Sequence, residues 1–148
     1  MICVRYFELA LKTVLLAALG LPWVSHAAAM DIEDGWIRAV PPVSSTTAGY
    51  LILHNRGDTD RTLTGVSSPV AGAGEVHDMS PQEDGTRHMH HLPELVVPAG
   101  EAVALKPGGK HLMLYQLQRP LEIGEQIEVC LAFAEGEPVC GPFEVRAP

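Results

Sequence analysis

The feature that most constrains this fold is the way turn residues divide the chain into short segments from about residue 35 onward. Gly, Pro, Asp and Asn cluster at 55–58, 84–85, 98–100 and 107–109, and no long stretch of helical periodicity lies between them. Short alternating segments separated by such turns are typical of an all-β sandwich or barrel. The segments predicted as strands are 35–39, 48–55, 61–67, 74–79, 87–92, 102–105, 111–117, 126–134 and 139–145.

The beginning of the chain has the pattern of an export signal. An apolar run at 13–24 follows Arg5 and Lys12 and precedes small residues at 25–29. A basic start, a short apolar core and an A-x-A-like end are typical of a secretory signal peptide. We therefore expect residues 1–29 to be a signal, cleaved after residue 27 or 29, and residues 30–148 to form one exported domain. An uncleaved buried helix is the alternative.

The charge of the expected mature domain excludes some partners. Residues 30–148 contain eight Lys and Arg against seventeen Asp and Glu. An acidic surface repels nucleic acid and anionic lipid, so neither is an expected partner. We expect a monomer that is not inserted in the membrane once the signal is removed.

Two cysteines of the mature domain are expected to form a disulfide. Cys130 and Cys140 lie on two segments joined by a three-residue loop, in which Gly136 would take the left-handed position. That register places the two cysteines directly opposite each other, where Cα atoms are about 4.5–5.5 Å apart and a disulfide can form. A dithiol that binds copper or reduces a partner is the alternative.

Histidine and methionine gather in one part of the sequence. Five of the six histidines of the mature domain and three of its four methionines lie between residues 77 and 113. His77 and Met79 are two residues apart on a predicted strand and share a face, and the same holds for His111 and Met113. Leu112, between the last two, is expected to point into the core.

This combination of side chains favours soft copper. Thioether sulfur prefers Cu(I), imidazole also suits copper, and a thioether cannot form a disulfide in an oxidising compartment. A single Met on a strand is usually core filler and a single His is usually a surface residue. The repeated His-x-Met units in a 37-residue window make metal binding the stronger interpretation.

The spacing of these residues resembles that of a known family. Eleven residues separate His77 from Met89, twenty-one separate Met89 from His111, and one separates His111 from Met113. This resembles the motif of the periplasmic copper-chaperone family written PCuAC, and similar stretches occur at 36–38, 48–55 and 97–114. The resemblance implies a cupredoxin-like Greek-key β-sandwich or barrel in the periplasm. It also implies Cu(I) bound by His77, Met89, His111 and Met113, and copper delivery to an acceptor protein of respiratory oxidase assembly.

Several residues depart from that pattern. His88, His90 and His91 are not in the motif, nor are Cys130 and Cys140, and residues 143–148 contain no His or Met. Met79 shares a face with His77 and is either a cover over the site or an occasional ligand. On a strand, His88 and His90 share the face opposite Met89, whereas His91 shares the face of Met89. His88 and His90 therefore form either a second, weaker Cu(II)-binding site or a solvated strand edge that binds no metal.

Three other classes of protein remain as alternatives. A copper enzyme would need an open coordination position, and we expect no catalytic activity. A blue-copper electron carrier would need a Cys thiolate beside two His. A β-sandwich interaction module would bind no copper.

Overall fold

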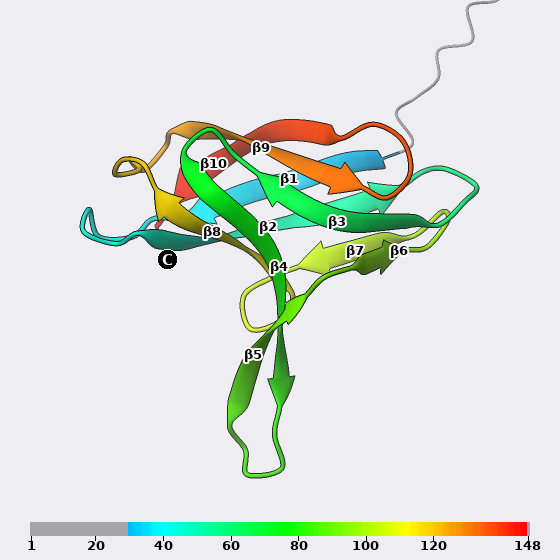
Figure 1. The fold of residues 1–148 in the computed structure, drawn as a ribbon, viewed down its shortest axis with the longest axis horizontal. Helices are drawn as coiled ribbons and strands as arrows, with labels where there is room; N and C mark the ends of the chain where they lie inside the picture. The colour runs from blue at the N-terminus through cyan, green and yellow to red at the C-terminus, as the bar shows by residue number, and fades with distance from the viewer. Residues whose placement is uncertain (1–29, 148) are drawn as a thin grey trace, which may run out of the picture.

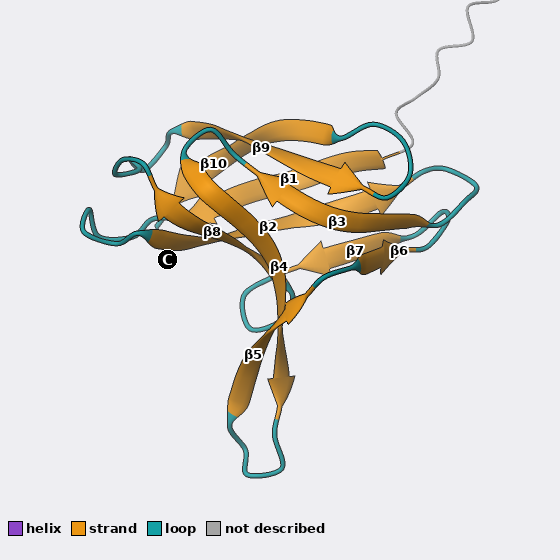
Figure 2. Cartoon of the chain, in the orientation of Figure 1, coloured by secondary structure: helices purple, strands orange, loops and turns teal. Residues whose placement is uncertain are grey.

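The structure is a computed structural model that describes residues 30–147. The predicted signal peptide lies outside the described residues. Within the described part every regular element is a strand (Figure 2), and no helix there is long and apolar enough to cross a membrane. The strands are β1 (Met30–Arg38), β2 (Thr46–Asn55), β3 (Arg61–Ser67), β4 (Ala71–Pro81), β5 (Arg87–Leu92), β6 (Leu95–Val97), β7 (Ala102–Leu105), β8 (His111–Leu117), β9 (Gln126–Phe133) and β10 (Val139–Arg146).

Seven of these strands form a closed barrel (Figure 1). Hydrogen-bonded neighbours follow the order β4, β8, β2, β1, β10, β9 and β3, and β3 returns to β4 where Val66 lies opposite Gly74. Strands β1 and β10 are parallel, and the other neighbours in this ring are antiparallel. Closure removes the exposed sheet edges of the ring, and the predicted all-β class is confirmed.

Alternating side chains fill the interior of the barrel. On β9 the residues Ile127, Val129, Leu131 and Phe133 are buried, as their period-two pattern predicts. Phe143 on β10 is fully buried and packs in the same apolar core. Burial of these side chains supplies the main stabilisation, at roughly 1.5–3 kcal/mol for each fully buried large apolar residue.

The strand predictions differ most from the structure in three places. β1 begins at Met30 rather than at residue 35, because Asp34 adopts a positive φ of 48° and a bulge carries the strand past it. β4 is longer than predicted at both ends. β6 was not predicted, since three residues between Pro93 and Pro98 carry too little pattern.

The second half of β4 leaves the barrel with β5 as a two-stranded arm (Figure 1). Its register pairs Val76 with Leu92, and the strands stay paired as far as Pro81 and Arg87. β5 has only β4 as a neighbour, and its residues 87–91 are all exposed. β5 is therefore a solvent-exposed edge strand beside the barrel.

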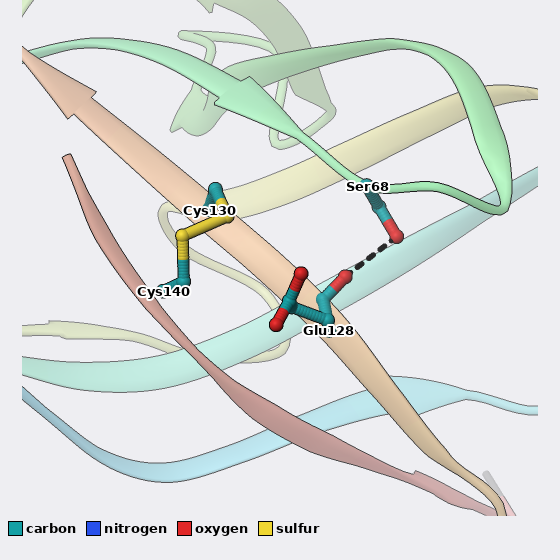
Figure 3. The surroundings of a disulfide bond; sticks show 4 residues. All are labelled: Ser68, Glu128, Cys130 and Cys140. Carbon is teal, nitrogen blue, oxygen red and sulfur yellow. Dashed lines mark hydrogen bonds between the residues drawn. A yellow bond between two sulfur atoms is a disulfide. The ribbon is translucent and has the colours of Figure 1, made fainter.

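The predicted disulfide is present (Figure 3). Cys130 and Cys140 are directly opposite each other on β9 and β10, and their sulfurs are bonded with the Cα atoms 4.0 Å apart. Gly136 in the hairpin loop has a φ of 76°, as the loop prediction requires. Next to the bond, the Ser68 hydroxyl donates to the Glu128 backbone carbonyl oxygen at 2.7 Å. The disulfide therefore connects the last two strands of the barrel.

Candidate metal centre

Three histidines form one row across three neighbouring strands. His77 on β4 lies opposite His91 on β5 and opposite His111 on β8. Because residues directly opposite each other share a face, all three side chains project on the same side of the sheet. The ring centroids of His77 and His91 are 5.6 Å apart, and those of His77 and His111 are 6.0 Å apart.

The methionines lie in the neighbouring rows of the same face. Met79 on β4 is opposite Met89 on β5, and Met113 on β8 is opposite Glu75 on β4. His77, Met89, His111 and Met113, predicted as ligands from their spacing, therefore all lie on one face of β5, β4 and β8. The structure brings them to one surface, and their binding of metal stays a prediction.

One ring nitrogen of His77 is hydrogen-bonded, and the other has no hydrogen-bond partner among the described residues. Its Nε2 lies 2.8 Å from the Glu75 carboxylate and 3.1 Å from the Tyr115 hydroxyl. Its Nδ1 is buried and has no hydrogen-bond partner among the described residues. A carboxylate can only accept, so in the neutral imidazole Nε2 carries the hydrogen and Nδ1 presents a lone pair. A buried lone pair of this kind suits a metal ligand.

In His111 the hydrogen-bonded ring nitrogen is Nδ1, whereas in His77 it is Nε2. The Nδ1 of His111 lies 2.8 Å from the backbone carbonyl oxygen of Gly109, in the turn before β8. Since a carbonyl oxygen can only accept, Nδ1 donates, and in the neutral imidazole Nε2 keeps its lone pair. Metal-binding histidines usually donate their other N–H to a carboxylate or carbonyl in this way. Both imidazoles thus have the hydrogen bond that orients a ligand.

The floor of the candidate site is buried and its rim is open. His77 and His111 are each 7% exposed, while Met89 on the arm is 49% exposed. Leu112, between His111 and Met113, is buried in the core as predicted. The imidazoles are therefore part of the rigid barrel wall, and the Met89 thioether is accessible from solvent.

Aromatic residues flank the histidine row. Tyr50 is buried, its ring centroid lies 6.4 Å from that of His111, and Trp36 packs on Tyr50 at 4.4 Å. Tyr115 lies edge-on to His77. Desolvation, with the nearby Glu75 charge, raises the pKa of the Tyr115 hydroxyl above its ordinary value. The hydroxyl therefore stays neutral beside His77.

His88 and His90 lie on the opposite face of the arm, as the strand parity predicts. His90 is opposite Asp78, and His88 is opposite Ser80. The Asp78 carboxylate forms an ion pair with Lys110 at 3.0 Å. Although burial opposes ionisation, the hydrogen bonds from Lys110 and from the Met79 N–H lower the pKa of Asp78 below its ordinary value. Among residues 30–147, no group of three or more His, Cys, Asp or Glu side chains is arranged to enclose a metal ion.

Sequence reasoning missed two residues that contact the site. Glu75 and Tyr115 each hydrogen-bond to His77. Both were detectable in part, since Glu75 is two residues before His77 and Tyr115 is two residues after Met113. Period two places each on the site face. Their contact with His77 depends on the pairing of β4 with β8.

The cysteines do not belong to this site. Cys130 and Cys140 lie on β9 and β10, away from β4, β5 and β8 in the strand order, and they are bonded to each other. Neither offers the thiolate that a blue-copper centre needs. The blue-copper alternative therefore lacks its sulfur ligand in the described part of the chain.

Solved structures share this fold. A copper-bound PCuAC domain from PmoF2 is 24% identical, with a TM-score of 0.67 over 81% of this chain and 94% of that one. The Cu(I) form of DR1885 from Deinococcus radiodurans is 29% identical, with a TM-score of 0.63 over 82% of this chain and 83% of that one. The barrel thus has the cupredoxin-like fold of the PCuAC domains, which confirms the fold predicted from the resemblance.

Sequence comparison identifies the family. A curated relative named "Putative lipoprotein Lxx21020", from Leifsonia xyli subsp. xyli (strain CTCB07), is 30% identical over 121 residues, which cover 80% of this chain and 72% of the relative. The family described as "Putative lipoprotein LpqE-like" matches residues 30–145. The chain belongs to this LpqE-like family, which is of the PCuAC type.

Proposed function

We propose that this protein is a copper chaperone that binds one Cu(I) with His77, Met89, His111 and Met113. The observation that carries the proposal is the buried, unpartnered Nδ1 of His77 in the described structure, in one cross-strand row with His111. An unsatisfied buried nitrogen is costly unless a ligand uses it. A copper ion in front of the row would use this nitrogen and the Nε2 of His111.

The donor set favours copper in its reduced state. Thioethers are soft ligands that prefer Cu(I), and imidazole completes a four-coordinate set. Zinc would more typically recruit thiolate or carboxylate together with imidazole. Copper in the PmoF2 domain and Cu(I) in DR1885, two chains with this fold, are in keeping with the same cargo.

The arrangement suits a carrier better than an enzyme. Two sulfurs and two nitrogens would leave copper without the open position that catalysis requires. Met89 is half-exposed on the arm, so an incoming ligand from an acceptor can replace it first. We propose that the acceptor is a protein of respiratory oxidase copper-site assembly, as the PCuAC resemblance implies.

We place this activity outside the cytoplasm, in the periplasm. The disulfide between Cys130 and Cys140 supports this, because such bonds persist in oxidising compartments. The curated relative is named a lipoprotein, and lipid attachment would hold the domain at a membrane surface facing that compartment. Cell fractionation with and without detergent distinguishes a free periplasmic form from an anchored one.

Anaerobic Cu(I) titration against a chromophoric chelator tests the binding site. His111→Ala and Met113→Ala should each weaken Cu(I) binding at least tenfold, which corresponds to about 1.4 kcal/mol. His88→Ala is the matched control, because it removes an exposed imidazole from the other face of the arm. Wild-type affinity in both site variants would show that the ligand assignment is wrong.

Delivery needs a separate test. A strain that lacks this protein should assemble oxidase with less copper under copper limitation, and wild-type protein should restore it. The Met113→Ala variant should not. Normal oxidase copper in the deletion strain would exclude this acceptor while leaving Cu(I) binding intact.

A further inference from the structure

His91 is the member of the histidine row that the spacing motif does not include. It lies opposite His77 on the edge strand, and its ring is nearer to His77 than the His111 ring is, at 5.6 Å against 6.0 Å between centroids. His91 is exposed, so its position is not explained by packing in the core.

We propose that His91 is a third imidazole ligand that allows the same pocket to hold Cu(II), together with His77 and His111. The proposal rests on the proposed copper-binding function and extends it to a second oxidation state. In it the two thioethers bind Cu(I), and the three imidazoles bind Cu(II).

Each ring separation from His77 is compatible with an ion shared by that pair of histidines. A metal about 2.0 Å from an imidazole nitrogen is about 3 Å from the ring centre, so two rings on one ion have centroids at most about 6 Å apart. His77–His91 and His77–His111 both fall within this limit. His91 and His111 lie on opposite sides of His77, so one ion can contact all three rings only if a side chain turns.

The free ring nitrogens make His77, the middle histidine of the row, the central ligand of the site. His77 would coordinate through Nδ1, which lies close to its backbone, whereas His111 would coordinate through Nε2, which reaches further. His91 flanks His77 on the other side and is free to turn over it from the solvent-exposed edge. This turn is required, because residues 30–147 hold no three-ligand group of His, Cys, Asp or Glu already arranged around one point.

The chemistry of Cu(II) requires such a ligand. Cu(II) prefers nitrogen and oxygen donors, so oxidised copper at a site with two imidazoles and two thioethers is weakly held. A third imidazole adds a nitrogen donor where the two thioethers bind Cu(II) weakly. The Glu75 carboxylate on His77 adds negative charge behind the row, which favours the higher charge of Cu(II).

His88 and His90, the other two histidines of the arm, are less suited to bind Cu(II) than the row through His91. His88 and His90 are on the opposite face, and neither pairs with His77 or His111. Asp78, the carboxylate opposite His90, is already engaged by Lys110. We therefore expect Cu(II) to bind to the row of His91, His77 and His111 rather than to His88 and His90.

Cu(II) titration of the whole protein tests the proposal. His91→Ala should lower Cu(II) affinity at least tenfold and remove one nitrogen from the electron paramagnetic resonance hyperfine pattern, while Cu(I) affinity changes less than twofold. The matched control His88→Ala/His90→Ala should change neither. Wild-type protein whose pocket is filled with Cu(I) under anaerobic conditions should not take up Cu(II) as a second equivalent.

Four outcomes would overturn the proposal. They are no Cu(II) binding by wild type, unchanged Cu(II) affinity in His91→Ala, loss of Cu(II) binding only in the His88→Ala/His90→Ala control, and uptake of Cu(II) by protein already filled with Cu(I). Each can occur with normal Cu(I) binding, in which case the proposed function stands. Loss of Cu(I) binding in wild type would instead refute the proposed function.

Discussion

Replacing Glu75 with glutamine isolates the effect of the charge behind His77. The Glu75 carboxylate accepts the hydrogen of His77 Nε2 at 2.8 Å, which leaves Nδ1 for the metal. Glutamine has nearly the same shape and still offers an amide oxygen as acceptor. Glu75→Gln should therefore preserve the orientation of His77 and remove the negative charge.

The expected magnitude follows from the geometry and exposure of this pair. Hydrogen bonds to charged groups contribute about 1.5–3 kcal/mol. The Glu75 side chain is 42% exposed, so solvent screening moves the effect toward the lower end of that range. Loss of an outer partner of a metal-binding histidine typically weakens metal affinity 10–100-fold. We expect Cu(I) affinity to fall about tenfold, or about 1.4 kcal/mol.

The chain contains a matched control for this substitution. Glu33 pairs with His54 at 2.6 Å in another exposed carboxylate–histidine contact, between β1 and β2. Glu33→Gln makes the same chemical change away from the histidine row, and it should leave Cu(I) affinity unchanged in the same chelator competition. If the two variants bind Cu(I) equally, the carboxylate behind His77 has no role and the reasoning fails.

Three further predictions concern sulfur and acid stability. Replacing Cys130 and Cys140 with alanine should cost about 2.7 kcal/mol in the chain-entropy estimate for their separation of ten residues. Urea unfolding of the copper-free protein measures this cost, and equal stability of the two proteins would contradict the prediction. X-ray absorption at the copper edge should count two sulfurs around Cu(I), whereas three would include Met79. The hydrogen bond from Arg119 lowers the pKa of Glu125 below its ordinary value of 4.5. Ionised Glu125 therefore stabilises the fold above pH 4.5, and this stabilisation is lost as the pH falls through the lowered pKa. Glu125→Gln should therefore reduce the loss of unfolding free energy on acidification, and an unchanged acid dependence would count against this pair.

Local alternation in the sequence was sufficient to predict much of the barrel. Period two identified nine of the ten strands, the inward side of β9 and the pairing of Cys130 with Cys140. The cysteine register was predictable because both strands adjoin one short hairpin loop, which sets the pairing. β6 was not predictable in this way, because its three residues form a strand only through pairing with β3.

For the candidate site, the sequence by itself determined which side chains share a face of each strand. His77 with Met79, and His111 with Met113, follow from alternation and need no knowledge of the fold. The spacing of His77, Met89, His111 and Met113 also sufficed for the PCuAC resemblance, and the comparisons confirm that resemblance.

Only the tertiary structure decided which strands are neighbours and in what register. His77 and His111 are 34 residues apart in the chain, and their opposition depends on the pairing of β4 with β8. The same pairing brings Tyr115 to His77, and the β4–β5 register adds His91 to the row. Alternation is a local property of a strand, whereas pairing between distant strands is set by how the complete core packs.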